Sequence, residues 1–188
     1  MEGTKLLAPS AHSIMEIGSQ GSRFITQIDQ VPQFATNGHC AGGTGSFFED
    51  QMSRLGLSIE DYSKLVDQAT SVPRLSGRCA VCKTDIIHRQ QEGVCTPDIL
   101  LGLCYAMIKN YKATIVRDLL VDKPVAFCGG VTKNRGVIRA IKEVFDLQEN
   151  ELIISEYASF AGAAGAALHA SGSFNREQLL CAADHMKE

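Results

Sequence analysis

The chain has 188 residues, of which 45% are apolar and 21% charged, and its formal net charge is −3. This length is enough for one domain with a sizeable core or for two small lobes. Because Lys and Arg are scattered rather than clustered, the charge pattern argues against a nucleic-acid binder or a polybasic membrane-surface protein. We therefore expect no nucleic acid and no membrane among the partners.

The chain also lacks the sequence features of a secreted protein. The apolar stretch at 6–9 is too short for the h-region of a signal peptide. The Ala/Gly-rich run at 160–170 has about half the length needed to span a bilayer. Seven cysteines at irregular spacing favour reduced thiols over a disulfide framework. These features predict a soluble, cytoplasmic protein in a reducing or anaerobic setting.

The first part of the chain predicts three short strands in a row, at 13–17, 22–28 and 33–36. Turn residues separate them, which is the pattern of a meander. A Gly-rich segment at 40–45 follows and opens a helix of about ten to twelve residues, because apolar residues recur at helical spacing after it. These residues are Phe47, Phe48, Met52 and Leu55.

The middle of the chain predicts three helices. Ser58 is a candidate N-cap for a helix that runs to about residue 69. A second helix begins at Cys79 and continues to residue 91. Thr96 as N-cap, with Pro97 at the first helical position, opens a long apolar helix over 97–120. Its apolar composition predicts a core position.

The last part alternates strands and helices. We expect a buried strand at 125–128, a helix opened by Asn134 or Thr132, a strand at 151–155, a small-residue helix at 160–170 and a helical tail at 172–188. A meander followed by βαβ-type units is α/β and is typical of the ribonuclease H-like fold. We therefore expect a single lobe of this kind over 1–188.

Three Gly-rich turns, at 18–22, 42–45 and 129–131, follow a strand or precede a helix. Glycine lets backbone N–H groups approach a phosphate closely, and a helix N-terminus favours anions. Any one of them alone is better explained as a simple tight turn. Three of them within an α/β pattern favour nucleotide binding, although none matches the Walker A or dinucleotide fingerprint.

Cys40 and Cys79 both lie at predicted helix entrances, where the field of the helix stabilises thiolates. Two cysteines are half of a four-thiolate iron–sulfur site, which a symmetric dimer would complete. The alternative is that both are small core residues. The C-x-x-C formed by Cys79 and Cys82 also admits a redox dithiol or half of a zinc site, but a zinc site needs a second ligand pair at matching spacing, which the sequence lacks.

Glu16 is the carboxylate at the end of the first predicted strand, next to the turn at Gly18. It could bind Mg²⁺ through water or orient an attacking water. The alternative is a glutamate at the surface end of a strand.

Five segments in order resemble the motifs of one family: EIGSQGSR (16–23), NGHCAGGTGSFFE (37–49), SGRCAVCKTDIIH (76–88), FCGGVTKNRGV (127–137) and FAGAAGAALHA (160–170). This is the BadF/BadG/BcrA/BcrD ATPase family, the activators of 2-hydroxyacyl-CoA dehydratases and benzoyl-CoA reductases. The resemblance covers residues 6–171. An ordered set of five motifs is specific, whereas a single Gly-rich turn is not.

The resemblance implies the actin-like ATPase fold, of which this chain would be one ribonuclease H-like, C-terminal lobe. It implies a homodimer with one [4Fe–4S] cluster at its interface, ATP or ADP with Mg²⁺, and low-potential electron transfer to an acyl-CoA dehydratase or reductase. By this carry-over Cys40 and Cys79 are cluster ligands, and Glu16 and Gln20 act on the phosphates. The remaining nucleotide-binding residues are Gly18, Gly42, Gly43, Thr44, Gly129, Gly130 and Asn134.

Three departures from the family pattern qualify these expectations. The first phosphate hairpin is absent, so we expect an excised fragment of a longer activator that has half of the ATP site. Glu16 and Gly21 replace the usual aspartates, and Cys82 is an alternative ligand to Cys79. The alternative function is a degenerate actin-like nucleotide-binding domain that acts as an interaction lobe without hydrolysis.

Overall fold

The computed structural model describes residues 1–38, 44–76 and 79–171, and for 79–81 and 171 only the backbone. The predicted tail at 172–188 lies outside these ranges. So do three predicted site residues, Cys40, Gly42 and Gly43.

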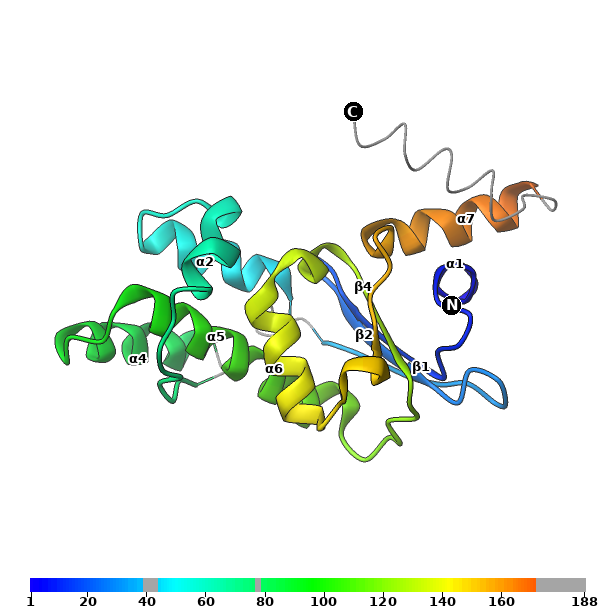
Figure 1. Cartoon of the computed structure of the whole chain (residues 1–188), viewed down its shortest axis with the longest axis horizontal. Helices are drawn as coiled ribbons and strands as arrows, with labels where there is room; N and C mark the ends of the chain where they lie inside the picture. Colours follow the sequence, from blue (N-terminus) through cyan, green and yellow to red (C-terminus); the bar gives the residue numbers. More distant parts are fainter. Residues whose placement is uncertain (39–43, 77–78, 172–188) are drawn as a thin grey trace.

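A five-stranded mixed sheet forms the centre of the structure (Figure 1). Its strands are β1 (Ser13–Ile17), β2 (Ser22–Thr26), β3 (Gln33–Thr36), β4 (Val125–Cys128) and β5 (Leu152–Ile153), in the order β3-β2-β1-β4-β5. The first three pair antiparallel, whereas β4 pairs parallel to β1 and β5 parallel to β4. The predicted α/β class and the predicted meander are therefore confirmed.

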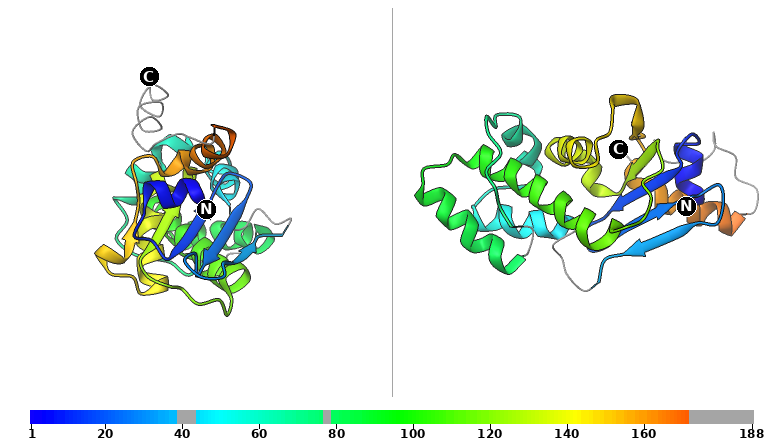
Figure 2. Two further views of the ribbon diagram at one scale, coloured as in Figure 1. Left: turned by 90° about the vertical axis from the view of Figure 1, so that its right-hand side faces the viewer. Right: turned by 90° about the horizontal axis from the view of Figure 1, so that it is seen from below.

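Helices cover both faces of the sheet. On one side lie α2 (Gly45–Arg54), α3 (Tyr62–Val66), α4 (Cys79–Gln91), α5 (Thr96–Tyr111) and α6 (Arg135–Phe145), and on the other α1 (Glu2–Leu7) and α7 (Ala161–Ser171). The right-hand view of Figure 2 shows the same arrangement, with α4 (green) at the end of the molecule away from α1 (blue).

Successive side chains of a strand point to opposite faces of the sheet, and each face of this sheet packs in a separate core. Met15, Ile17 and Phe127 are fully buried in the main core under the larger helix layer. Ile14 and Cys128 point the other way and pack with Ala161 of α7. The sheet is thus buried on both faces at β1 and β4, which is where its carboxyl ends carry the Gly-rich turns.

The long apolar helix of the sequence prediction is a core helix. By length and composition, residues 96–116 are the one described helical segment that could span a bilayer, and most of this segment is buried inside the protein. The helix is shorter than predicted, because α5 passes into a π-turn at 112–116 and the backbone reverses at Arg117 with φ of +50°. Its N-cap is Cys95 rather than Thr96.

Three further elements differ from the predictions. The strand expected at 151–155 is reduced to β5 at Leu152–Ile153, because the 3₁₀ turn Glu149–Glu151 directly precedes it. β2 ends at Thr26 because Gln27 adopts a positive φ of 53°, which extended strands do not contain. The predicted helix from Ser58 to residue 69 is divided into η2 (Ile59–Asp61) and α3, and it ends at Val66. Ser58 does act as its N-cap, by accepting the Glu60 N–H at 3.3 Å.

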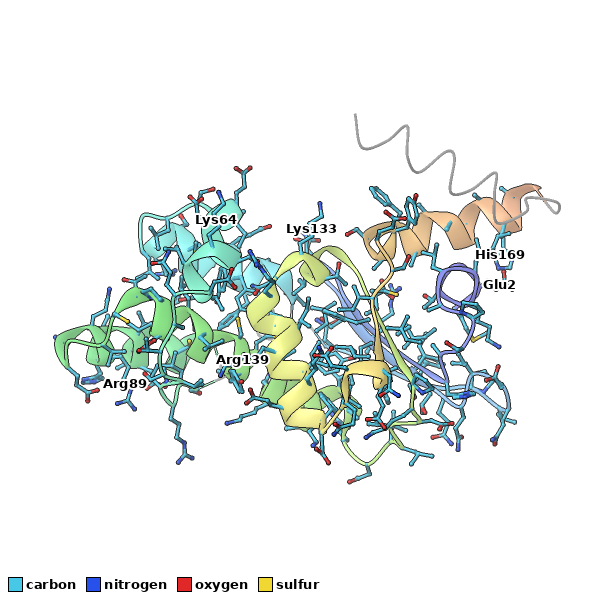
Figure 3. All side chains as sticks on the ribbon, viewed as in Figure 1. Glu2, Lys64, Arg89, Lys133, Arg139 and His169 are labelled. Carbon is cyan, nitrogen blue, oxygen red and sulfur yellow. The ribbon has the colours of Figure 1, made fainter. Side chains whose placement is uncertain are left out.

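The short helix α1 was not predicted. It packs against α7 at Gly3, where an added Cβ would overlap the carbonyl oxygen of Ala161. His169 of α7 and Glu2 of α1 point toward one another and pair at 2.9 Å (Figure 3). A six-residue helix is marginal by itself, so this tertiary contact is what accounts for it.

A buried aspartate attaches the segment before α4 to the core helix α5. The Asp98 carboxylate accepts the N–H groups of Thr70 and Ser71 at 2.7 and 3.0 Å, and their hydroxyls at 3.4 and 2.6 Å. These bonds, that of the Ser71 hydroxyl foremost, lower the pKa of Asp98 to about 2. The charged form is therefore the form that the folded state stabilises.

We expect Asp98→Asn to lower the free energy of unfolding at neutral pH by about 2 kcal/mol, since the carboxyl pKa falls from 3.8 to about 2 on folding. A lowered pKa stabilises the fold above pH 4 and loses this effect as the pH falls toward 2. Urea unfolding at pH 7 and pH 3 measures this. The variant should lose less stability than the wild type between the two values, and an unchanged pH dependence would contradict the assignment. Asp67→Asn, at an exposed ion pair with Arg135, is the control and should cost little.

Candidate functional site

The turn after β1 and the entrance of α2 lie together at the carboxyl edge of the sheet. The Gly45 N–H donates to the Gly18 carbonyl at 2.8 Å, and the Ser46 N–H donates to the Ser19 carbonyl at 2.8 Å. The turn itself is closed by the Gly18 N–H, which donates to the Gly21 carbonyl at 2.8 Å. Two of the three predicted Gly-rich segments are therefore in direct contact.

The third Gly-rich turn, after β4, packs against the first. Gly129 has a φ of +99°, and a Cβ at this position would overlap the carbonyl of Ile17. Both the backbone conformation and the close approach thus require glycine. Because β1 and β4 are adjacent and parallel, their carboxyl ends lie side by side, where open α/β sheets bind ligands.

A cavity of about 460 Å³ opens beside this meeting point. Apolar and polar side chains both line it, a mixture that suits the base and sugar of a nucleotide. Its lining residues are Ser19, Gly45, Phe48, Glu49, Ile59, Glu60, Tyr62, Ser63, Gly130, Val131, Lys133 and Asn134.

Hydrogen bonds hold the wall of this cavity in place. Asn134 caps α6 by accepting the Val137 N–H at 3.2 Å. The Ser63 hydroxyl donates to the Lys133 carbonyl at 2.9 Å and accepts the Arg135 N–H at 3.2 Å. The segment at 59–63 is therefore fixed to the entrance of α6 without any ligand.

Tyr62 closes the floor of the cavity. Its hydroxyl donates to the Leu100 carbonyl at 2.7 Å, and burial raises its pKa well above the usual range. The side chain is therefore neutral, and at 2% exposure it belongs to the main core. Phe48 packs edge-on against its ring, with the centroids 5.1 Å apart.

A second cavity, of about 430 Å³, lies on the other side of the glycine turns, beside α1 and α7. Glu16, Gly18 and Gly129 line it, and Gly130 lines both cavities. The Glu16 carboxylate is 37% exposed and accepts from the Arg23 guanidinium at 3.3 Å. Glu16 thus lies at the predicted phosphate end of the site, already in an ion pair.

The predicted nucleotide residues are only partly brought together. Gly18, Gly129, Gly130 and Asn134 line the two cavities. Thr44 is fully buried at the entrance of α2, where its hydroxyl lies 3.0 Å from that of Ser46. Gln20 is exposed in the turn after β1 and lines neither of the two cavities described above. Cys40, Gly42 and Gly43 lie outside the described residues.

The cysteines separate into different environments. Cys79 is the first residue of α4, as predicted from its position at a helix entrance. Cys82 is fully buried in the main core, as is Cys104, where burial raises the pKa to about 12. Cys128 is buried under α7, and Cys95 is exposed. The burial of Cys82 favours a packing role.

Within the ranges that the structure describes, no three His, Cys, Asp or Glu side chains gather as a metal site. A complete four-thiolate site would therefore need residues from outside these ranges or from a second chain. Cys79 at a helix N-terminus and Cys40, close before α2 in the sequence, fit such a shared site by residue type and helix position.

The residues at 59–63 and Lys133 were not predicted as part of the site. They reach the cavity through tertiary packing of η2 and α3 against the entrance of α6. The one sequence signal is Ile59, an apolar residue directly after an N-cap, which remains 41% exposed on the cavity wall. Periodicity alone would have placed it against the core.

Comparison with known proteins agrees with this architecture. The model of the BadF/BadG/BcrA/BcrD ATPase family matches residues 1–170. The activator of lactoyl-CoA dehydratase from Anaerotignum propionicum is 32% identical over 172 residues, which are 90% of this chain and 65% of that protein. The (R)-2-hydroxyglutaryl-CoA dehydratase activating ATPase from Acidaminococcus fermentans is 28% identical over 170 residues, 89% of this chain and 64% of that protein.

A solved structure shows the same fold. It is component A of (R)-2-hydroxyglutaryl-CoA dehydratase from Acidaminococcus fermentans, with a TM-score of 0.81 and 25% identity. The match covers 89% of this chain and 64% of that one. The chain thus spans somewhat less than two thirds of the length of the relatives it matches.

Proposed function

The chain belongs to the BadF/BadG/BcrA/BcrD ATPase family, and from this premise we propose that it is the nucleotide-binding, cluster-bearing part of an ATP-dependent activator. The observation that carries the proposal is the convergence of the glycine turns of β1, α2 and β4 beside a cavity of nucleoside size. The relatives named as activators of acyl-CoA dehydratases support it.

Each part of the site then has a role toward the nucleotide. Ile59, Tyr62 and Asn134 bind the base and sugar, and Gly130 lies where the two cavities meet. The turns at Gly18 and Gly129 present backbone to the phosphates. Glu16, with Gln20 in the same turn, would act on Mg²⁺ and on the attacking water, and this role requires residues from a second lobe.

Cys40 and Cys79 from two copies of the chain would hold one [4Fe–4S] cluster between them. Cys79 contributes from the N-terminus of α4, where backbone N–H groups and the helix field stabilise thiolates. The bound cluster would supply one electron at low potential, and ATP would supply the driving force. The acceptor is an acyl-CoA dehydratase or reductase, and the setting is an anaerobic cytoplasm.

We expect Ile59→Ala to weaken ADP binding by about tenfold, because it removes apolar surface from the cavity wall. The fold should keep its stability, since Ile59 is 41% exposed. Isothermal titration calorimetry or ligand-detected NMR on the 188-residue chain measures the affinity.

Val72→Ala is the matched control, because Val72 is 40% exposed and lines neither cavity of the described structure. It should bind ADP as the wild type does. If both variants bind equally well, the cavity is not the nucleotide site.

One observation favours a second candidate, a nucleotide-binding lobe that does not hydrolyse ATP. The Glu16 carboxylate, which would hold Mg²⁺, is paired with the Arg23 guanidinium on the neighbouring strand. The positive partner competes with a cation for the same oxygens. In this candidate the chain serves as an interaction lobe.

Phosphate release from MgATP can contradict the second candidate. We expect no release above background from the 188-residue chain under either of them. Turnover by this chain alone would contradict the second candidate, and it would also contradict the requirement for residues from a second lobe.

A further inference from the structure

A buried thiol lies directly behind the wall of the 460 Å³ cavity. Cys104 of α5 is fully buried, and its Sγ lies 3.7 Å from the Tyr62 hydroxyl oxygen and 3.8 Å from the Asn134 Oδ1. Tyr62 and Asn134 line the cavity, whereas Cys104 does not. The thiol can therefore influence a ligand there only through the side chains that it contacts.

A glycine allows this thiol to reach the entrance of α6. Gly136 lies in the first turn of α6, where an added Cβ would come within 2.8 Å of the Cys104 Sγ and 3.3 Å of the Asn134 Oδ1. Any larger residue at this position would push the thiol and the Asn134 side chain apart. The contact between Cys104 and Asn134 is thus part of the packing of α5 against α6.

The contacts fix which end of the Asn134 amide faces inward. Its Oδ1 accepts the backbone N–H of Val137 at 3.2 Å, and this donor cannot turn. Burial raises the pKa of the Cys104 thiol to about 12, so the S–H group keeps its proton and is a second donor toward the same oxygen. An amide turned the other way would direct its NH₂ group at both donors.

This orientation leaves the Asn134 NH₂ group for the cavity. The side chain is half-buried and lines the cavity, and its NH₂ group donates to no other residue of the described structure. We propose that Asn134 presents a hydrogen-bond donor to the nucleoside, and that Cys104 is a positioning residue that holds the amide in this orientation. The inference rests on the proposed function and deepens it, because the ligand must then offer an acceptor, such as a purine ring nitrogen or a ribose oxygen.

Asn134→Asp tests the donor, because a carboxylate still caps the Val137 N–H but has no N–H group to donate. The probe is adenosine, which carries no phosphate for the new charge to repel. We expect the full 188-residue chain to lose about tenfold in adenosine affinity, measured by ligand-detected NMR. The urea unfolding midpoint should not fall, since an aspartate is a good N-cap. Equal or tighter binding would overturn the inference, because the cavity would then be facing an acceptor.

Cys104→Ala tests the positioning role and should weaken adenosine binding about threefold. Cys104→Ser is the matched variant, because it also shortens the side chain but keeps a donor, and it should recover most of the lost affinity. If the serine variant binds as weakly as the alanine variant, the thiol does not act as a donor to Asn134 and the positioning role is wrong.

A double-mutant cycle separates positioning from packing. In the Asn134→Asp background, Cys104→Ala should cause no further loss of affinity, because both carboxylate oxygens are acceptors and either may face the cavity. Its effect on the urea midpoint should be the same in both backgrounds. An equal loss of affinity in both backgrounds would show that Cys104 acts through packing alone, which contradicts the positioning role.

Binding by the wild type keeps this inference separate from the proposed function. A wild-type chain that binds neither adenosine nor ADP contradicts the proposed nucleotide site, and this inference with it. A wild-type chain that binds adenosine, together with an Asn134→Asp variant that binds it equally well, contradicts this inference alone.

Discussion

Replacing Cys40 or Cys79 with alanine is expected to abolish iron uptake by the chain, since each substitution removes two of the four thiolates of a cluster shared by two copies. The measurement is anaerobic reconstitution with iron and sulfide, followed by iron analysis and the visible spectrum. The wild type should bind four iron atoms per two chains, and each variant close to none. This is the largest change that any single substitution should produce.

Cys95→Ala and Cys82→Ala are the matched controls. Cys95 is exposed at the start of α5, and Cys82 is buried in the main core three residues after Cys79. Both variants should keep the cluster. If Cys79→Ala keeps its iron and Cys82→Ala loses it, Cys82 is the ligand in place of Cys79. If all variants keep their iron, the proposed cluster site is contradicted.

Gly129→Ala should produce the second largest effect, on both stability and nucleotide binding. Its φ of +99° is strained for any residue with a Cβ, and that Cβ would overlap the Ile17 carbonyl. Relief of the overlap requires β4 and β1 to separate at the site. We expect a loss of about 3 kcal/mol in the free energy of unfolding and no measurable ADP binding.

Gly130→Ala separates this effect from the mere addition of a methyl group. A Cβ at Gly130 meets no atom within 4 Å, and its φ is not positive. Urea unfolding should therefore give a wild-type midpoint for this variant and a strongly lowered one for Gly129→Ala. Equal midpoints would contradict the packing that brings the two turns together.

Local sequence patterns predicted the central sheet and the glycine turns. The strands β1, β3 and β4 begin and end where the alternating or apolar runs do, and Asn134 caps α6 as expected. These features depend on short-range rules of strand propensity, turn chemistry and capping. They are readable because nothing distant in the sequence is needed to form them.

What the sequence did not reveal depends on tertiary contacts. α1 is a helix because Gly3 lets it approach α7, about 160 residues away in the chain. The cavity wall at Ile59–Asp61 and Tyr62 exists because Ser63 bonds to the entrance of α6. Periodicity describes one element at a time, so it could not place these residues at the site.

The predicted site residues also divide into those that local motifs place correctly and those whose side chains depend on tertiary packing. Gly18, Gly129, Gly130 and Asn134 were predicted from motifs and lie at the cavities. Thr44 was taken from the same Gly-rich pattern, yet its side chain is buried at the entrance of α2. A motif identifies the backbone turn, whereas the direction of each side chain depends on what packs against it.

Native mass spectrometry of the anaerobically reconstituted chain tests the central claim most directly. The account predicts a species with the mass of two chains and one [4Fe–4S] cluster, which binds ADP and is absent from the Cys40→Ala and Cys79→Ala variants. A reconstituted chain whose mass contains no iron, or a complete cluster bound to a single chain, would contradict it.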